Sequence, residues 1–109
     1  MEFINKVQLC GVVGNVHTEN FSKDKKLTTL AVCVNDVFKN TDGLAVVETT
    51  WFRVSVWDTK EEFAKGQWVS LTGRFRQRRY IDSTNNERIV YDVVAQEIHT
   101  LKVEQNETL

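Results

Sequence analysis

The sequence predicts an all-β domain: a five-stranded Greek-key barrel with one short helix between the third and fourth strands. Four observations support this prediction: the length of the chain, the absence of proline, the alternation of apolar and polar residues, and the hydrophobic content. The chain has 109 residues and no proline, and apolar and polar residues alternate along most of it. Its hydrophobic content of 41% is ordinary for a globular protein, and its length suffices for one modest core. We expect a single domain over residues 1–103 and a short polar tail over 104–109.

The first half of the chain predicts three strands. Residues 6–14 are rich in β-branched side chains, and glycines within them mark points where a strand bends or bulges. Residues 20–26 are polar and lysine-rich, which is typical of a loop. Residues 27–35 alternate with Leu30 and Val32 on one face, which predicts a half-buried second strand.

An Asn-Thr-Asp-Gly turn at 40–43 predicts a long hairpin leading into a third strand, Ala45 to Trp57. Asp58 then has the character of a helix N-cap, with Glu61 three residues later. Gly66 is a suitable stop. These residues predict about two turns of helix over 59–65.

The second half of the chain predicts two further strands, 67–80 and 88–101, separated by a polar loop at 82–86. Five strands with one helix between the third and fourth is the element order of the OB-fold. An SH3-like barrel or a short sandwich stays open from the pattern alone, because element order does not fix topology.

Basic residues are concentrated although the net charge is only −1. Six of the fourteen basic residues are Arg53, Arg74, Arg76, Arg78, Arg79 and Arg88. A local stripe of charge, and not the overall balance, decides what a surface binds.

The predicted fourth strand carries most of this charge on one face. Alternation places Arg74, Arg76, Arg78 and Tyr80 together and directs Arg79 to the other side. A row of guanidinium groups that ends in an aromatic ring suits a surface that follows a polyanion and stacks on its bases. An arginine-rich strand can also serve solvation alone.

The third strand carries the second half of the pattern. Phe52, Val54 and Val56 form a core stripe, and the opposite face carries Trp51, Arg53 and Trp57. Two indoles on a surface need a partner to cover them: a nucleic acid, a second subunit or a loop. Beside the arginine-rich strand, with which they would form a two-strand platform, they favour stacking on bases. Phe38 and Lys39 near the hairpin tip are further candidates, and Lys6 and Lys39 are the weaker basic ones.

The sequence resembles the bacterial single-stranded DNA-binding protein family from about Phe3 to Leu101. The stretches that carry the resemblance are Asn5–Gly11, Glu48–Val54, Lys65–Arg76 and the aromatic Tyr80 before a polar loop. The resemblance implies an OB-fold, a homo-oligomer that is usually a tetramer, with a dimer as the alternative, and sequence-independent wrapping of single-stranded DNA. It also implies base stacking at Phe38, Trp51, Trp57 and Tyr80, and basic contacts at Arg53 and Arg76.

The sequence departs from the family pattern in three places. It ends at Leu109 without the long tail and acidic tip that recruit replication partners, so we expect no recruitment by that route. The predicted helix is short. Phe52 replaces a histidine that several members carry near subunit contacts.

No feature of the sequence predicts catalysis, a metal site or a cofactor. Only His17 and His99 are present, without metal-ligand spacing, and no phosphate-binding glycine loop occurs. Cys10 and Cys33 read as free thiols packed like small hydrophobes. Without a signal sequence or an apolar membrane span, we expect a cytoplasmic, nucleoid-associated protein. The alternative function is a protein-interaction OB module like that of primosomal replication protein N, with weak DNA binding.

Overall fold

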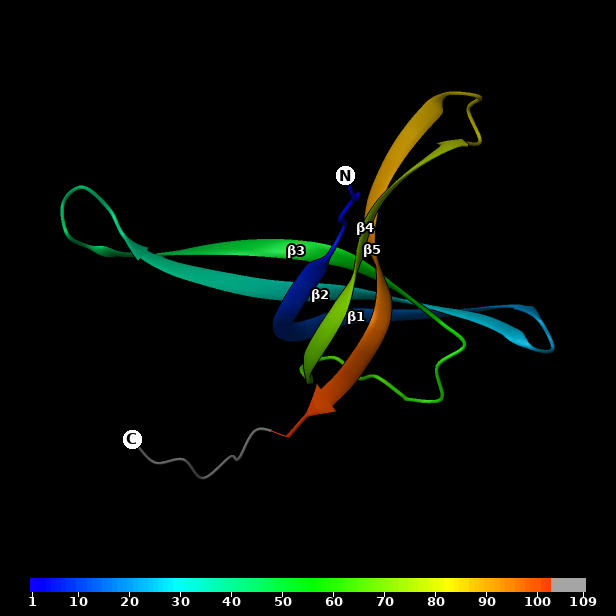
Figure 1. Cartoon of the computed structure of the whole chain (residues 1–109), viewed down its shortest axis with the longest axis horizontal. Coiled ribbons are helices and arrows are strands. Elements are labelled where there is room, and N and C mark those ends of the chain that lie inside the picture. The colour runs from blue at the N-terminus through cyan, green and yellow to red at the C-terminus, as the bar shows by residue number, and fades with distance from the viewer. Residues whose placement is uncertain (103–109) are drawn as a thin grey trace.

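The computed structural model describes residues 1–102, which are all-β (Figure 1). The strands are β1 (Val7–Ser22), β2 (Lys25–Lys39), β3 (Ala45–Trp57), β4 (Trp68–Ile81) and β5 (Glu87–Leu101). Residues 1–102 contain no helix that could cross a membrane. The predicted domain end at 103 and the predicted tail at 104–109 lie outside the described residues.

The five strands close into one barrel in the order β1-β2-β3-β5-β4, which confirms the predicted barrel. Neighbouring strands are antiparallel except β3 and β5, which pair in parallel. β1 closes the barrel because it has two partners: Val7–Val12 pair with β4, and the strand from Val12 onward pairs with β2. A register shift between Val13 and Asn15 leaves Gly14 unpaired at a bulge, where the strand bends.

Aliphatic side chains from every strand fill the barrel. The buried core residues are Val13, Leu30, Val32, Val54, Val56, Val69, Leu71 and Val93. The predicted core stripes of β2 and β3 are therefore confirmed. Valine and leucine on alternate positions suit this interior because β-branched and compact side chains pack well on a pleated surface.

The β2–β3 and β4–β5 hairpins extend beyond the barrel as arms, and the β1–β2 hairpin also protrudes (Figure 1). β2 and β3 stay paired out to Lys39 and Ala45, and the predicted turn follows, with Gly43 at φ 77°. The side chain of Asn40 stabilises this turn by accepting hydrogen bonds from the backbone N–H groups of Asp42 and Leu44. The β4–β5 arm leaves the barrel in another direction and ends at the polar loop that follows Ile81.

β1 extends further than the sequence predicts. It continues from the bulge to Ser22, and the predicted loop at 20–26 contracts to a turn at residues 23–24. The polar residues here are compatible with a strand because both faces of this protruding hairpin meet solvent. Cys10 and Cys33 are free, as predicted, but Cys10 is exposed and does not pack like a hydrophobe.

The predicted helix over 59–65 is absent. Asp58 has a φ of 52°, and its Oδ1 accepts a hydrogen bond of 2.8 Å from the backbone N–H of Lys26, so it does not cap a helix. Gly66 donates its N–H to the carbonyl of Val13 at 2.7 Å, which attaches the segment to β1. Isolated helices of fewer than about 12 residues are marginal, so these attachments prevail over a two-turn helix.

Candidate nucleic-acid interface

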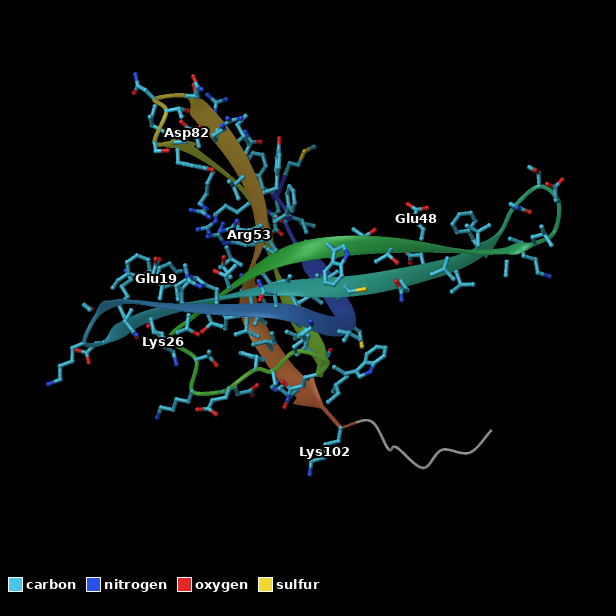
Figure 2. All side chains as sticks on the ribbon, turned by 180° about the vertical axis from the view of Figure 1, so that it is seen from behind. Glu19, Lys26, Glu48, Arg53, Asp82 and Lys102 are labelled. Carbon is cyan, nitrogen blue, oxygen red and sulfur yellow. The ribbon has the colours of Figure 1, made fainter. Side chains whose placement is uncertain are left out.

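β3 alternates between core and surface positions as the sequence predicts, except at Ser55, which lies on the outer face but is buried. Val54 and Val56 are buried, whereas Trp51 is 59% and Trp57 37% exposed. Arg53 lies between the two indoles along the strand and is exposed. Figure 2 shows Arg53 where the two arms diverge, with Asp82 at the tip of one arm and Glu48 on the other.

The strand order corrects the predicted two-strand platform. β5 lies between β3 and β4, so the arginine-rich strand does not adjoin the tryptophan-bearing strand. Ser55 of β3 pairs with Val94 of β5, and Val94 pairs with Arg74 of β4. The surface is therefore three strands wide. A prediction from element order alone placed β3 and β4 side by side because it did not include the parallel β3–β5 pair.

A buried carboxylate holds the three strands together. Asp92 of β5 accepts a hydrogen bond of 2.7 Å from Ser55 Oγ, and bonds of 3.0 and 2.7 Å from Nε and Nη2 of Arg76. Burial alone raises the pKa of Asp92, but the hydrogen bonds from Arg76 and Ser55 outweigh it, and the pKa lies below its usual value. Arg76 therefore holds the surface together as well as carrying charge.

The remaining arginines of β4 follow the predicted alternation. The residues of the row share one side of the β4–β5 arm. Across the arm, Arg74 pairs with Val94, Arg76 with Asp92, Arg78 with Val90 and Tyr80 with Arg88. Arg79 lies on the other side, where Nη1 is 3.4 Å from Glu87 Oε1. The Nε atom of Arg78 is buried and has no hydrogen-bond partner within residues 1–102.

Trp51 stands at the edge of an open groove of about 450 Å³ across β1, β2 and β3. The groove is lined by Asn15, His17, Thr29, Leu30, Ala31, Trp51, Phe52 and Arg53. The indole of Trp51 lies against Gly14, so closely that a Cβ there would be 2.5 Å from Cη2. The bulge in β1 therefore accommodates the ring.

Trp57 is more enclosed than Trp51. Its ring centroid lies 5.6 Å from that of Phe21, and Nζ of Lys25 lies 5.2 Å from the ring centroid. A cation over an indole face is an attractive contact that a base would have to displace. Of the two predicted β3 stacking residues, Trp51 thus offers the more accessible ring.

Phe38 does not join this surface. The β2–β3 register runs without a bulge from Leu27–Trp57 to Lys39–Ala45, so strand alternation puts Phe38 on the opposite side of the ribbon from Trp51. Phe38 is exposed and lies near the tip of the arm. Lys39 shares the side of Trp51 but lies farther out along the arm than Phe38.

Lys6 lies at the edge of β4. The side chain of the preceding residue, Asn5, donates to the carbonyl of Phe75 at 2.7 Å and accepts from its N–H at 2.9 Å. Val7 pairs with Gly73, so Lys6 is held next to the start of the arginine row. Lys6, one of the weaker binding candidates, therefore lies where it adds positive charge to the start of this row.

Asn15, His17 and Asp92 are parts of the surface that the sequence did not single out. Asn15 and His17 reach the groove because the bulge shifts the register of β1. Asp92 occupies an apolar run in which neither face could be assigned. Among the described residues no cluster of three or more His, Cys, Asp or Glu side chains could hold a metal ion. The surface thus offers aromatic rings and guanidinium groups, which suit stacking and anion binding.

Solved structures share this fold. "Plasmodium falciparum SSB complex with ssDNA" matches with a TM-score of 0.81 at 18% identity, over 94% of this chain and 98% of that one. A deletion mutant of the single-stranded DNA binding protein from Thermus aquaticus matches with a TM-score of 0.78 at 19% identity, over 91% of this chain and 51% of that one. At these identities the likeness shows the OB-fold.

Sequence relatives are bacterial. A single-stranded DNA-binding protein of Neisseria meningitidis serogroup A is 28% identical over 90% of this chain and 60% of its own length. One from Xylella fastidiosa strain Temecula1 is 30% identical over 90% of this chain and 63% of its own length. The chain thus spans less than two thirds of the length of these relatives. The model of the Single-strand binding protein family matches residues 4–101, and the chain belongs to that family.

Proposed function

We propose that this protein binds single-stranded DNA without sequence preference and protects it during replication, recombination or repair. The observation that carries the proposal is that exposed aromatic rings, Trp51 on β3 and Tyr80 on β4, occur together with arginines on strands that β5 joins into one sheet. Membership of the single-strand binding protein family supports the same function. The proposed activity is binding and not catalysis.

In the proposed mechanism the arginines capture phosphates and the rings stack on bases. Arg53, Arg74 and Arg78 contribute charge, while Arg76 divides its donors between Asp92 and the ligand. The logarithm of affinity should fall with the logarithm of salt with a slope of about −0.7 per neutralised phosphate. Each stacked base contributes about 1–3 kcal/mol. Duplex DNA hides its base faces and should bind weakly.

The proposal includes self-association, with a homotetramer as the expected state and a dimer as the alternative. One OB domain covers roughly 4–16 nucleotides, so several copies are needed to wrap a longer strand. A bacterial protein with this function would act in the cytoplasm at the nucleoid. Light scattering with and without oligo-dT measures the assembly directly.

Titration of tryptophan fluorescence with oligo-dT tests the function. Substitution of Trp51 or Tyr80 with alanine should each weaken binding by about 1–3 kcal/mol, because each removes a stacking surface. Trp68→Ala is the matched control, since Trp68 is exposed but lies at the barrel end of β4, away from the arginine row. Phe38→Ala and Trp57→Ala complete the series.

Two outcomes would contradict the assignment. If the fluorescence of the wild-type protein does not change on titration and no binding is detected, the fold serves another purpose, and the protein-interaction module becomes the better hypothesis. If the wild type binds but Trp51→Ala and Tyr80→Ala bind equally well, the stacking surface lies elsewhere on the barrel.

A further inference from the structure

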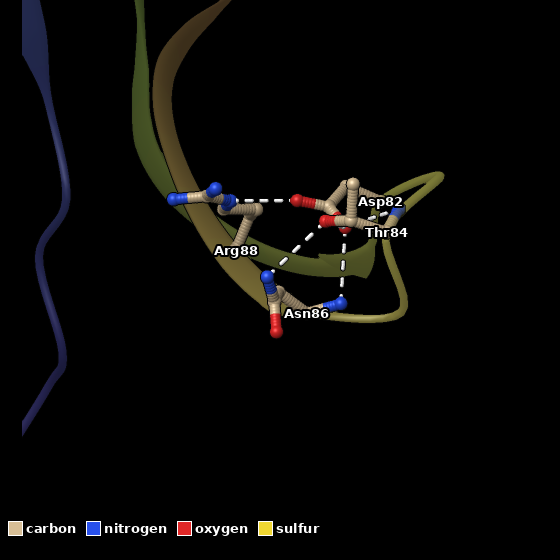
Figure 3. A network of polar contacts seen from close by, with 4 residues as sticks. All are labelled: Asp82, Thr84, Asn86 and Arg88. Carbon is tan, nitrogen blue, oxygen red and sulfur yellow. Dashed lines mark hydrogen bonds and ion pairs between the residues drawn. The ribbon is translucent and has the colours of Figure 1, made fainter.

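The tip of the β4–β5 arm is closed by a network around Asp82 (Figure 3). Its Oδ1 accepts hydrogen bonds from the N–H of Thr84 at 2.9 Å, the hydroxyl of Thr84 at 2.6 Å and the N–H of Asn86 at 3.0 Å. Its Oδ2 accepts a bond of 2.8 Å from Nε of Arg88. Asn86 Nδ2 donates to the Thr84 hydroxyl at 3.1 Å, which links the two sides of the loop.

This network fixes the Arg88 guanidinium by one edge only. Its Nε atom is bound to Asp82, whereas neither Nη atom makes a hydrogen bond in the described part of the chain. The side chain of Arg88 is 58% exposed, and that of Asp82 only 20%. The donors that remain on Arg88 are thus available to a ligand, while the carboxylate is largely covered.

Arg88 also lies beside Tyr80 and next to the arginine row of β4. It pairs directly with Tyr80 across the arm, and the neighbouring pair on that side is Arg78 with Val90. The row of arginines on β4 therefore continues onto β5 at the point where the predicted stacking ring lies. Arg88 belongs to the concentrated basic residues of the sequence, but its place beside Tyr80 could not be predicted, because it follows a polar loop and the face of its strand could not be assigned.

We propose that Arg88 is a phosphate-binding residue of the single-stranded DNA interface and that Asp82 is the residue that positions it beside Tyr80. The proposal rests on the proposed function. A guanidinium presents donors in a fixed fork that matches two phosphate oxygens. Holding its Nε edge in advance reduces the conformational entropy that a long side chain loses on binding.

Salt-dependent binding of oligo-dT separates this role from a purely structural one. Arg88→Gln should weaken binding roughly tenfold, as expected for a hydrogen bond to a charged group. It should also make the salt slope shallower by about 0.7, the contribution of one phosphate contact. Arg79→Gln is the matched control: it removes the same charge from the opposite side of the same arm and should leave the slope unchanged.

For Asp82→Asn, general electrostatics and positioning of Arg88 predict opposite changes in the affinity for oligo-dT. General electrostatics predicts tighter binding, because a negative charge is removed from a surface that binds a polyanion. Positioning predicts weaker binding and a shallower slope, because Arg88 loses its partner. Arg88→Lys keeps the charge without the fork, so it should retain the slope and lose affinity. Thermal unfolding of each variant verifies that the barrel is intact.

The proposal is overturned if Arg88→Gln keeps the wild-type salt slope, or if Asp82→Asn binds more tightly than the wild type. Absence of binding by the wild-type protein would instead overturn the proposed function itself, and this inference with it. The two failures are distinguishable in the same titration.

Discussion

At the scale of single residues, Gly14 determines how Trp51 presents its ring. Gly14 is unpaired at the bulge in β1, and the indole lies on its backbone. Its φ is not positive, so the backbone would accept an L-residue, and the requirement for glycine comes from the contact. A residue without a side chain thus sets the exposure of the more accessible tryptophan on β3.

We expect Gly14→Ala to displace the Trp51 ring and weaken oligo-dT binding by up to about 1–3 kcal/mol, the contribution of one stacked base. Affinity by fluorescence titration and secondary structure by circular dichroism are the measurements. In a Trp51→Ala background the same substitution should cause no further loss of affinity for oligo-dT, because the ring that it would displace is absent. Equal losses in both backgrounds would show that Gly14 acts through the backbone instead.

At the scale of elements, the connection from β3 to β4 is attached to the barrel by Asp58. Its N–H donates to the carbonyl of Lys26 at 2.8 Å, and its Oδ1 accepts from the N–H of the same residue. The pair of bonds joins the end of β3 to the start of β2, with Asp58 at a positive φ. Asp and Asn tolerate this conformation better than most residues.

The order of stability among Asp58 variants follows from two requirements: a side-chain hydrogen-bond acceptor and tolerance of a positive φ. Asp58→Asn keeps the side-chain acceptor and tolerates the positive φ, so its free energy of unfolding should match that of the wild type. Asp58→Gly loses the acceptor only, and Asp58→Ala loses it and adds backbone strain, for a total of about 1–2 kcal/mol. Urea unfolding measures the series. An alanine variant as stable as the wild type would contradict the assigned role of this side chain.

At the scale of the whole molecule, two carboxylates, those of Asp82 and Asp92, form ion pairs with arginines of β4 and β5. Asp92 links β5 to β3 and β4, and its pKa is lowered by the hydrogen bonds that outweigh its burial. The pKa of Asp82 is lowered chiefly by the hydroxyl of Thr84 and next by Arg88. Both groups bind protons less readily in the folded protein than in the unfolded chain, so both make stability depend on pH.

The free energy of unfolding should therefore decrease on acidification. A carboxylate with a lowered folded-state pKa contributes its full stabilisation above its unfolded pKa, about 3.9 for Asp, and loses it as pH falls through the folded value. Thermal unfolding between pH 7 and pH 2 measures this.

Asp92→Asn is the companion variant for the acid series. It should be less stable at pH 7 by about 1–3 kcal/mol, because Arg76 and the buried Ser55 lose a charged acceptor, and it should depend less on pH below about 4. Arg79→Gln, which weakens only a surface ion pair, should keep the wild-type acid profile. An unchanged acid profile for Asp92→Asn would exclude Asp92 as a source of the pH dependence.

The sequence by itself determined the number and order of the strands, the core stripes of β2 and β3, the hairpin turn after Asn40 and the arginine face of β4. These features are local: alternation and turn chemistry operate over a few neighbouring residues, so they can be recognised without knowing the partners of a strand. The resemblance of several short stretches to one family supplied the barrel class, which the element order alone left open.

Only the tertiary structure decided which of these faces meet. The parallel pairing of β3 with β5 inserts Asp92 between the tryptophan and arginine strands. Attachment of residues 58–67 to β1 and β2 replaces the helix that local signals favour. Register and alternation put Phe38 on the far side of its arm. The first two outcomes depend on hydrogen bonds between residues distant in sequence, for which alternation and turn signals carry no information. The side of Phe38 follows from the register of the β2–β3 hairpin.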